Sequence, residues 1–340
     1  MNWNLPRQMF GTVLLAASAG LAAADTPQLD FEHAYGVSLH RGDLRPGDLR
    51  SIKDAGFGWV RLDLPWAQVE KRRGVYDFSV FDKFFSDIEA QGLRALVILA
   101  YGNPLYAEPG DKSPFASRVS TVGFRQAYAA FSAAAVARYA GHGFLWEQWN
   151  EPNNKHSWPP AADSGAYVML MKEAGRAIRE KCPQEVLIGP ASSFVDLPYI
   201  EACLQGGMLD YWSAITIHPY RETEPEVAAK DYARLRALIA KYAPPGKTVP
   251  IICGEWGYST AWRGYDDYKQ ADFLTRMFQL SQKENIPLTI WYDWRDDGDD
   301  PHSQEHRFGL VRRSPKGTFD PKPAYFAARR VLKESAVPTP

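Results

Sequence analysis

Short apolar runs alternate with longer amphipathic stretches along this chain from about residue 33 onward. The apolar runs, rich in Val, Ile, Leu and aromatic residues, predict eight β-strands at residues 33–39, 59–64, 95–100, 144–149, 186–188, 214–218, 249–253 and 288–294. Many of these runs are apolar throughout rather than at every second position, which is typical of parallel strands covered on both faces.

The stretches between the strands carry apolar residues three and four positions apart, which is the spacing of an amphipathic helix. They predict helices at residues 46–55, 80–91, 122–140, 164–181, 197–205, 225–242, 267–284 and 323–333. The strict alternation predicts a single-domain (β/α)8 barrel, the TIM barrel of the α/β class. A doubly wound open sheet is the alternative, and it is disfavoured because no Gly-rich phosphate-binding loop follows a strand.

Two glutamates stand at the ends of predicted strands beside tryptophan. Glu151 lies in the segment WNEPN (149–153) after the fourth strand, and Glu255 lies in GEW (254–256) after the seventh. In a barrel, such positions meet at one rim, where barrel enzymes carry their chemistry. A lone glutamate there is most often half of a structural salt bridge. Two in matching settings predict paired carboxylates that flank a glycosidic bond.

The two carboxyl groups need different surroundings if one shuttles a proton and the other attacks a sugar. A proton shuttle needs a raised pKa, whereas a nucleophile must stay ionised beside cations and hydrogen-bond donors. Arg61, at the end of the second strand, and Tyr220, after the sixth, are the candidates near Glu255. A rim ion pair for Arg61 and wall packing for Tyr220 are the alternatives. Glu255 is therefore predicted as the nucleophile and Glu151 as the acid and base.

Other rim residues are candidates for sugar contacts. Asn150 bonds a sugar 2-hydroxyl or forms a turn, and His218 orients the acid, binds a hydroxyl or makes a structural hydrogen bond. Alternation along the eighth strand separates Trp291 from Tyr292. We favour Trp291 as the floor under the reacting sugar, with the helix-facing core as the alternative. Weaker candidates for subsites are Trp66, Tyr101, Asn103, Trp158, Trp256 and Trp262.

Two loops are predicted to wall the cleft: the Pro- and Gly-punctuated residues 102–121 and the acidic residues 293–301. The second contains four aspartates among residues 296–300, which raises the question of calcium. Because this run lacks the full helix–loop–helix ligand pattern, a solvated acidic loop is favoured. No His or Cys cluster has the spacing of a zinc site, so no metal and no cofactor are expected.

The N-terminus has the composition of a secretory signal peptide. Arg7 gives a positive start, residues 9–19 are apolar, and three alanines (22–24) offer a cleavage site. Cleavage would leave residues 25–340 as a secreted or periplasmic catalytic domain, and a retained anchor is the alternative. No later segment approaches the ~20 apolar residues of a membrane span, so no membrane contact is expected after cleavage.

The cysteines and the charge add two expectations. Export permits a disulfide between Cys182 and Cys203, although both can stay free, and Cys253 is expected to be an inert core thiol. The net charge is −1, whereas a protein that binds nucleic acid usually carries a basic surface, so no nucleic-acid partner is expected. The 11 Trp, 17 Tyr and 17 Phe either fill the core or offer flat rings to sugars.

These residues resemble clan A of the glycoside hydrolases, whose members are retaining (β/α)8 enzymes. The matching segments are WNEPN (149–153), IHPY (217–220), GEWG (254–257), WY (291–292), FGLV (308–311) and PKPAY (321–325). The resemblance covers roughly residues 33–333. Within the clan the chain is most similar to family 39, in particular to bacterial enzymes that cut biofilm exopolysaccharides. Family 5 cellulase-like and mannanase-like enzymes share most of these motifs, and the chain lacks a clear β-sandwich domain that several family 39 enzymes carry.

The resemblance implies Glu151 as the acid and base and Glu255 as the nucleophile, in agreement with the surroundings of the two residues. It also implies that Asn150, His218, Tyr220 and Trp291 contact or orient the sugar.

The sequence therefore predicts a secreted, monomeric, retaining β-glycoside hydrolase that cuts a polysaccharide or oligosaccharide, with internal cleavage favoured. A transglycosylase is one alternative. A catalytically silent carbohydrate-binding barrel is another, and it is disfavoured because both carboxylates are present. A nucleotide-dependent oxidoreductase would need the Gly-rich loop that the chain lacks.

Overall fold

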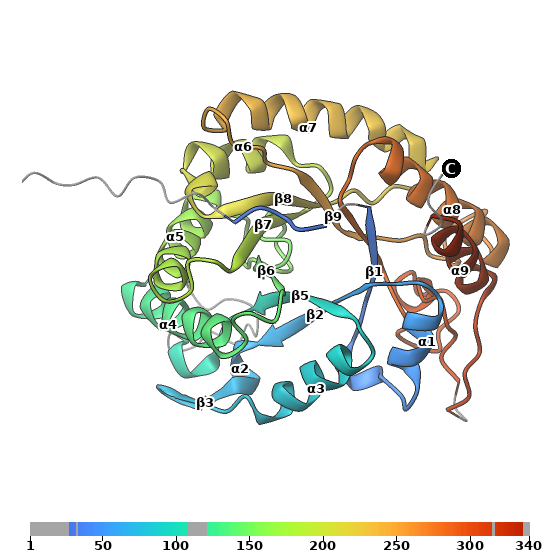
Figure 1. Cartoon of the computed structure of the whole chain (residues 1–340), viewed down its shortest axis with the longest axis horizontal. Helices are drawn as coiled ribbons and strands as arrows, with labels where there is room; N and C mark the ends of the chain where they lie inside the picture. The colour runs from blue at the N-terminus through green and yellow to red at the C-terminus, as the bar shows by residue number, and fades with distance from the viewer. Residues whose placement is uncertain (1–26, 32, 108–120, 315–316, 336–340) are drawn as a thin grey trace, which may run out of the picture.

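Eight parallel strands close into a barrel in the computed structural model, in the order β1-β10-β9-β8-β7-β6-β5-β2 (Figure 1). They are β1 (Ala34–Ser38), β2 (Trp59–Pro65), β5 (Arg94–Ala100), β6 (Leu145–Gln148), β7 (Val186–Ser193), β8 (Trp212–His218), β9 (Ile251–Trp256) and β10 (Leu288–Trp291). The structure describes residues 27–31, 33–107, 121–314 and 317–335. The predicted single-domain (β/α)8 barrel is confirmed.

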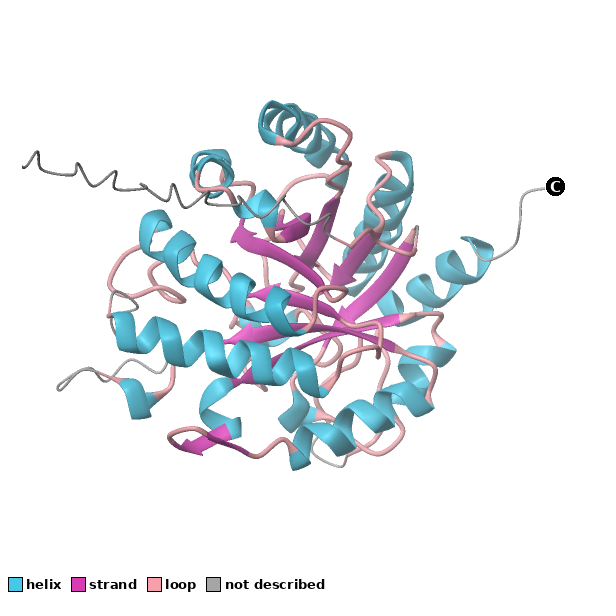
Figure 2. Ribbon diagram, turned by 60° about the vertical axis from the view of Figure 1, so that its left-hand side comes forward, coloured by secondary structure: helices cyan, strands magenta, loops and turns pink. Residues whose placement is uncertain are grey.

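The helices form a ring outside the strands (Figure 2). They are α1 (Asp48–Asp54), α3 (Ser79–Ala90), α4 (Val122–Arg138), α5 (Ser164–Lys181), α6 (Leu197–Gln205), α7 (Ala228–Tyr242), α8 (Asp267–Lys283) and α9 (Pro323–Ser335). Four helices, α4, α5, α6 and α8, are capped by the residue that precedes them, whose side-chain oxygen accepts from the backbone N–H of the third helical residue. The capping residues are Thr121, Asp163, Asp196 and Asp266. These caps explain why the four helices begin where they do.

One small insertion between β2 and α3 was not predicted. It consists of a single helical turn, α2 (Trp66–Val69), and a hairpin of β3 (Glu70–Arg72) and β4 (Val75–Tyr76). The hairpin strands are too short and too polar to give a strand pattern in the sequence.

The core has two layers, as expected for a barrel. Inside the barrel lie the side chains of Trp59, Leu96, Ile98, Ala100, Leu145, Ile188, Ala214, Ile252, Leu288 and Ile290. A larger, aromatic-rich layer fills the space between strands and helices. Gly36 belongs to the tight interior, because a Cβ atom there would stand 2.4 Å from Ile290 Cδ1 and 2.9 Å from the Trp59 carbonyl oxygen. Strands buried on both sides therefore account for the continuous apolar runs.

Three strand ends differ from the prediction by three residues or more, and all lie at the rim that carries the chemistry. β9 continues to Trp256, three residues beyond its predicted end, so Glu255 lies within the strand rather than after it. β7 continues through Pro190, Ala191 and two serines, although its apolar run ends near Ile188. β10 stops at Trp291, three residues earlier than its apolar run suggests. Hydrogen bonding to neighbouring strands, rather than apolar character, sets these ends.

The expectations outside the barrel have mixed outcomes. The signal peptide prediction falls on residues 1–24, which lie outside the described residues, as do residues 108–120 of the first predicted cleft loop. Cys182, Cys203 and Cys253 are all free and buried, so no disulfide joins the first two. Every helix in the described part of the chain is too short or too polar to cross a lipid bilayer.

Candidate active site

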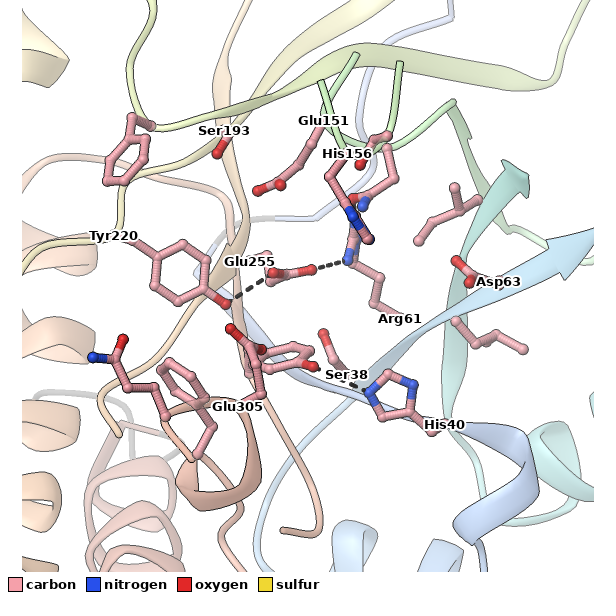
Figure 3. Close-up of a pocket in the computed structure, with 18 of the residues that line it drawn as sticks. Ser38, His40, Arg61, Asp63, Glu151, His156, Ser193, Tyr220, Glu255 and Glu305 are labelled. Carbon is pink, nitrogen blue, oxygen red and sulfur yellow. Dashed lines mark hydrogen bonds and ion pairs between the residues drawn. The ribbon is translucent and has the colours of Figure 1, made fainter. Parts of the chain in front are cut away.

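A cavity of about 960 Å³ opens at the carboxyl ends of the strands. Its lining brings together residues far apart in the sequence, including Arg61 from β2, Glu151 after β6, Tyr220 after β8 and Glu255 from β9 (Figure 3). This end of a (β/α)8 barrel is where active sites lie. The rim residues that alternation and strand ends predicted are thus neighbours in space.

The two predicted glutamates face each other in this cavity (Figure 3). Glu151, His218 and Glu255 each offer one donor atom, and the three atoms lie within 4.8 Å of one another. The side chains of Glu151 and Glu255 are 19% and 14% exposed, so both carboxylates reach the cavity from a largely buried base. A carboxylate separation of about 5–5.5 Å belongs to retaining glycosidases, whereas inverting enzymes need about 6.5–9.5 Å.

Arg61 is the cation that ties the site together. Its Nη1 donates to Glu255 Oε2 at 2.5 Å, its Nη2 donates to Asn150 Oδ1 at 2.7 Å, and its Nε donates to Glu147 Oε2 at 2.8 Å. Burial alone would lower the pKa of Arg61, but the charges of Glu147 and Glu255 outweigh it and raise that pKa. The guanidinium is therefore a permanent positive charge with a fixed fork of donors.

Glu147 is a functional-site residue that the sequence reading missed. It lies in β6, is completely buried, and shares Arg61 with Glu255. Gly254 gives it room, since a Cβ atom at that position would stand 3.1 Å from Glu147 Oε1. The signal in the sequence is an acid inside a predicted buried strand, where a charge requires a cationic partner.

The surroundings of Glu255 favour its ionised form. Burial raises the pKa of Glu255, but the charges of His218 and Arg61 and the hydrogen bonds from Tyr220 and Arg61 outweigh burial and hold it below its ordinary value. The Tyr220 hydroxyl donates to Glu255 Oε1 at 2.8 Å. Burial, followed by the charge of Glu255, raises the pKa of Tyr220 well above its usual range, so this hydroxyl keeps its proton.

Glu151 has a different set of partners. His218 Nδ1 lies 2.9 Å from Oε1, and the Asn154 amide donates to Oε2 at 2.8 Å. The other ring nitrogen of His218, Nε2, lies 3.4 Å from Nη2 of Arg61, which can only donate. The hydrogen-bond network thus places a proton on Nδ1 of His218, from which it is donated to Glu151.

The backbone around Glu151 is held in an unusual conformation. Trp149 and Glu151 have φ angles of 74° and 49°, which side-chain-bearing residues rarely adopt. Each such residue costs about 1–3 kcal/mol and needs support from its surroundings. The buried Trp149 ring donates to the Ser157 carbonyl at 3.1 Å, and the Glu151 N–H donates to the Ala191 carbonyl at 3.0 Å. The conformation turns the Glu151 carboxylate into the cavity.

Comparison with known proteins connects this geometry to a family. The sequence model of the cellulase family, glycosyl hydrolase family 5, matches residues 33–297. The chain belongs to this family. No curated protein matches the sequence.

Solved structures of family 39 share the fold. A family 39 glycoside hydrolase from the gut symbiont Bacteroides cellulosilyticus WH2 has 28% sequence identity and a TM-score of 0.76 over 91% of this chain. This chain covers 64% of that protein, slightly less than two thirds of its length. A family 39 β-xylosidase from Caulobacter crescentus has 22% identity, a TM-score of 0.69, and coverage of 91% of this chain and 73% of its own.

A family 39 enzyme from Xanthomonas axonopodis pv. citri has 22% identity and a TM-score of 0.70, with 92% of this chain and 68% of its own covered. Family membership and fold together confirm the predicted clan A glycoside hydrolase.

Trp291 does not lie where the sequence reading placed it. Its side chain is 0% exposed, belongs to the helix-facing core layer and points its Nε1 to the Phe308 carbonyl at 3.3 Å. The neighbouring Tyr292 lines the cavity instead. The prediction that Trp291 forms the floor under the sugar is therefore wrong. Trp291 is the last residue of β10, and its side chain points outward from the barrel and packs in the layer between strands and helices.

Four other predicted subsite residues are buried away from the cavity. They are Trp66, Asn103, Trp158 and Trp256. The Trp66 ring stacks between Tyr106 and Phe131, and the Asn103 amide spans the Glu70 carbonyl and the Leu105 N–H. Trp158 supports Trp149 in an edge contact, and the guanidinium of Arg221 covers Trp256. These residues stabilise the structure of the rim. The three tryptophans do so through the large apolar area that each ring buries. Tyr101 and Trp262, in contrast, do line the cavity.

Several cavity residues were not predicted. Asp63 lies two positions after Arg61 on the same face of β2, and burial raises its pKa against the charge of Arg61. Glu305, in a short 3-10 helix, has its pKa raised by burial and then by the charges of Glu255, Asp297 and Glu151. Asp63 could have been predicted, because residues two positions apart in a strand point to the same face and Arg61 faces the cavity. No sequence pattern points to Glu305.

The acidic loop after β10 is not solvated throughout, contrary to the prediction. Asp296 is buried and accepts a hydrogen bond from Lys322 Nζ at 2.6 Å, while Asp299 and Asp300 are exposed. Of the residues in the two loops predicted to wall the cleft, none that the structure describes lines the cavity. The wall on this side comes from residues 304–308, including Glu305 and Phe308.

Two groups of described residues place three donor atoms close enough for a metal ion. One is the Glu151, His218 and Glu255 group, whose atoms are engaged by Arg61, Tyr220 and one another. The other comprises His40, Asp293 and Asp297, and the Tyr292 hydroxyl lies between two of them, 3.3 Å from His40 Nε2 and 3.0 Å from Asp297 Oδ2. Hydrogen bonds among protein groups account for both arrangements.

Proposed function

We propose that the chain hydrolyses β-glycosidic bonds with net retention, with Glu255 as the nucleophile and Glu151 as the acid and base. The observation that carries this proposal is the facing carboxylate pair, whose nearest donor atoms lie within 4.8 Å. Such closeness supports retention, because inverting enzymes keep their carboxyl groups about 6.5–9.5 Å apart to make room for a water molecule.

In the first step, a carboxylate oxygen of Glu255 forms a bond to the anomeric carbon while the glycosidic C–O bond breaks. Glu151 gives its proton to the departing oxygen. In the second step, Glu151 takes a proton from water, the water oxygen bonds to the anomeric carbon, and Glu255 leaves. Arg61 and Tyr220 hold Glu255 ionised and aimed, and His218 and Asn154 fix the Glu151 carboxyl.

The direct test is the stereochemistry of the first product. Proton NMR of an early reaction mixture with a β-linked substrate is expected to record the β-anomer before mutarotation produces the α-anomer. An α-anomer as the first product would refute the double displacement and with it the nucleophilic role of Glu255. Absence of cleavage on β-linked glucans, xylans, mannans and galactans would favour a silent carbohydrate-binding barrel.

Replacing Tyr220→Phe removes a donor that lowers the pKa of Glu255, so that pKa is expected to rise. Because the enzyme needs Glu255 ionised, the acidic limb of the kcat/KM profile then moves to higher pH, with about a tenfold loss at the optimum. The matched control is Tyr242→Phe, since the Tyr242 hydroxyl donates to the carboxylate of Glu201 on the outer helices at 2.6 Å. A limb that stays in place or moves to lower pH would contradict the assignment.

We also propose a polysaccharide substrate cut internally, and export from the cell. The cavity volume of about 960 Å³ is at the upper end for small-molecule sites and supports binding of sugars on both sides of the broken bond. The signal-like composition of residues 1–24 supports secretion or a periplasmic location. A ladder of oligosaccharides from a glycan panel that includes the producer's exopolysaccharide is expected, whereas a single monosaccharide product would mean exo-action.

A further inference from the structure

An exposed phenyl ring stands at the wall of the active-site cavity. Phe194, at the end of β7, is 60% exposed and lines the cavity, and no other large exposed apolar residue in the described ranges does so. Phenylalanine gains stability by burial, so a ring left open in a binding cavity calls for an explanation. Four of the tryptophans predicted to contact sugar are buried instead: Trp66, Trp158, Trp256 and Trp291.

The segment that carries Phe194 is held rigidly in an unusual conformation. Phe194 has a φ angle of 56°, which a residue with a side chain rarely adopts. The Ser192 hydroxyl donates to the Phe194 carbonyl at 2.8 Å, and the Asn153 amide exchanges hydrogen bonds with the backbone of Ser193 at 2.9 Å and 2.8 Å. Phe194 also forms a β-bridge with His218. A strained residue supported from several sides marks a position with a function.

This segment is joined by hydrogen bonds to the loop that carries the acid and base. Glu151 donates its backbone N–H to Ala191 of β7, and Asn153, which belongs to the same loop as Glu151, clamps Ser193. The acid of a glycosidase protonates the oxygen of the leaving sugar. The leaving sugar must therefore lie on the side of the cavity that Glu151 and Phe194 share.

We propose that Phe194 is the aromatic platform for the leaving sugar, the unit on the reducing side of the broken bond. The inference rests on the proposed function, because it takes Glu151 as the acid. A pyranose ring presents C–H groups on one face, and a phenyl ring covers such a face without requiring any particular hydroxyl pattern. The site then prefers substrates whose leaving group is a sugar, as in an oligosaccharide or polysaccharide chain.

The test compares two substrates that share a reacting sugar and differ in the leaving group. One is a β-linked trisaccharide of glucose, xylose, mannose or galactose that the wild type cleaves, and the other is the glycosyl fluoride of the same sugar, which has no leaving sugar. For Phe194→Ala, kcat/KM on the trisaccharide is expected to fall about tenfold, equivalent to about 1.4 kcal/mol. On the fluoride, the value is expected to stay within about twofold of the wild type.

Two further variants separate binding from folding. Phe194→Tyr keeps a ring and is expected to retain trisaccharide cleavage, while Phe326→Ala removes a 54% exposed ring from α9 and is expected to change neither substrate. Equal losses on both substrates for Phe194→Ala, or no loss on either, would overturn the platform. A wild type that cleaves none of the four trisaccharides and none of the corresponding glycosyl fluorides would instead refute the proposed function, and that outcome does not depend on Phe194.

Discussion

Replacing Glu255→Gln is expected to abolish turnover, with kcat reduced by about 10⁴-fold or more. Glutamine keeps the shape: its carbonyl oxygen can accept from Arg61 while its NH2 group faces the Tyr220 hydroxyl oxygen. The neutral amide cannot form the glycosyl-enzyme bond. Arg61 keeps Glu147 as a buried partner, so the fold is expected to persist. Steady-state rates on an oligosaccharide and on a glycosyl fluoride both measure the loss, because both need the nucleophile.

The chain offers a closely matched control for this variant. Glu201 accepts hydrogen bonds from a lysine and a tyrosine, Lys241 at 2.7 Å and Tyr242 at 2.6 Å, but it lies on the outer helices. Glu201→Gln is expected to keep wild-type rates. Mass spectrometry after a 2-deoxy-2-fluoroglycoside inactivator is expected to find the label on the peptide that contains Glu255. A variant within tenfold of wild-type activity, or a label on another carboxylate, would exclude Glu255 as the nucleophile.

The barrel and the pair of glutamates were predictable because each follows from a local pattern. Continuous apolar runs identify strands buried on both faces, and a polar residue at the end of such a run must face the rim. Glu151, Glu255 and Tyr220 satisfy this rule, and for them a local rule and the strand order were sufficient. Arg61 does not end its strand as predicted: it is the third residue of β2 and reaches the cavity from within the barrel.

The rest of the cavity wall depends on contacts between distant segments, which a local pattern does not contain. Tryptophan rings were predicted to meet the sugar, yet Trp66, Trp256 and Trp291 are buried, because large rings stabilise the protein most between helix and strand. Phe194 reaches the cavity through a left-handed backbone position that no composition rule predicts. Glu147 acquires its partner from β2, 86 positions earlier in the chain.

The electrostatics of the site follow from the ion pair between Glu147 and Arg61. Arg61 carries one positive charge between two acids, Glu147 and Glu255, in a buried setting. Arg61 divides its positive charge between Glu147 and Glu255. Glu255 is therefore kept ionised, and its carboxylate keeps enough negative charge to attack the sugar. The separation of roles between the two cavity glutamates then comes from their neighbours: a cation and a phenol at Glu255, and an imidazole and an amide at Glu151.

Replacing Glu151→Gln is expected to slow cleavage of an unactivated oligosaccharide by about 10³-fold, within the range that a general acid contributes. The amide of the new side chain cannot protonate the leaving oxygen, but it still accepts from His218 and leaves the nucleophile in place. A 2,4-dinitrophenyl glycoside needs no such proton, because its leaving group departs as a stable anion. Formation of the glycosyl-enzyme from that substrate is therefore expected to stay fast.

The same variant also lacks the base of the second step, so the glycosyl-enzyme is expected to accumulate and produce a burst of dinitrophenol. Azide attacks without needing a base, and its addition is expected to restore turnover and to yield the β-glycosyl azide. Glu255→Gln is the matched control, since it has no nucleophile and should give neither a burst nor that product. Equal losses on activated and unactivated substrates, together with no azide product, would mean that Glu151 positions the substrate rather than transferring the proton.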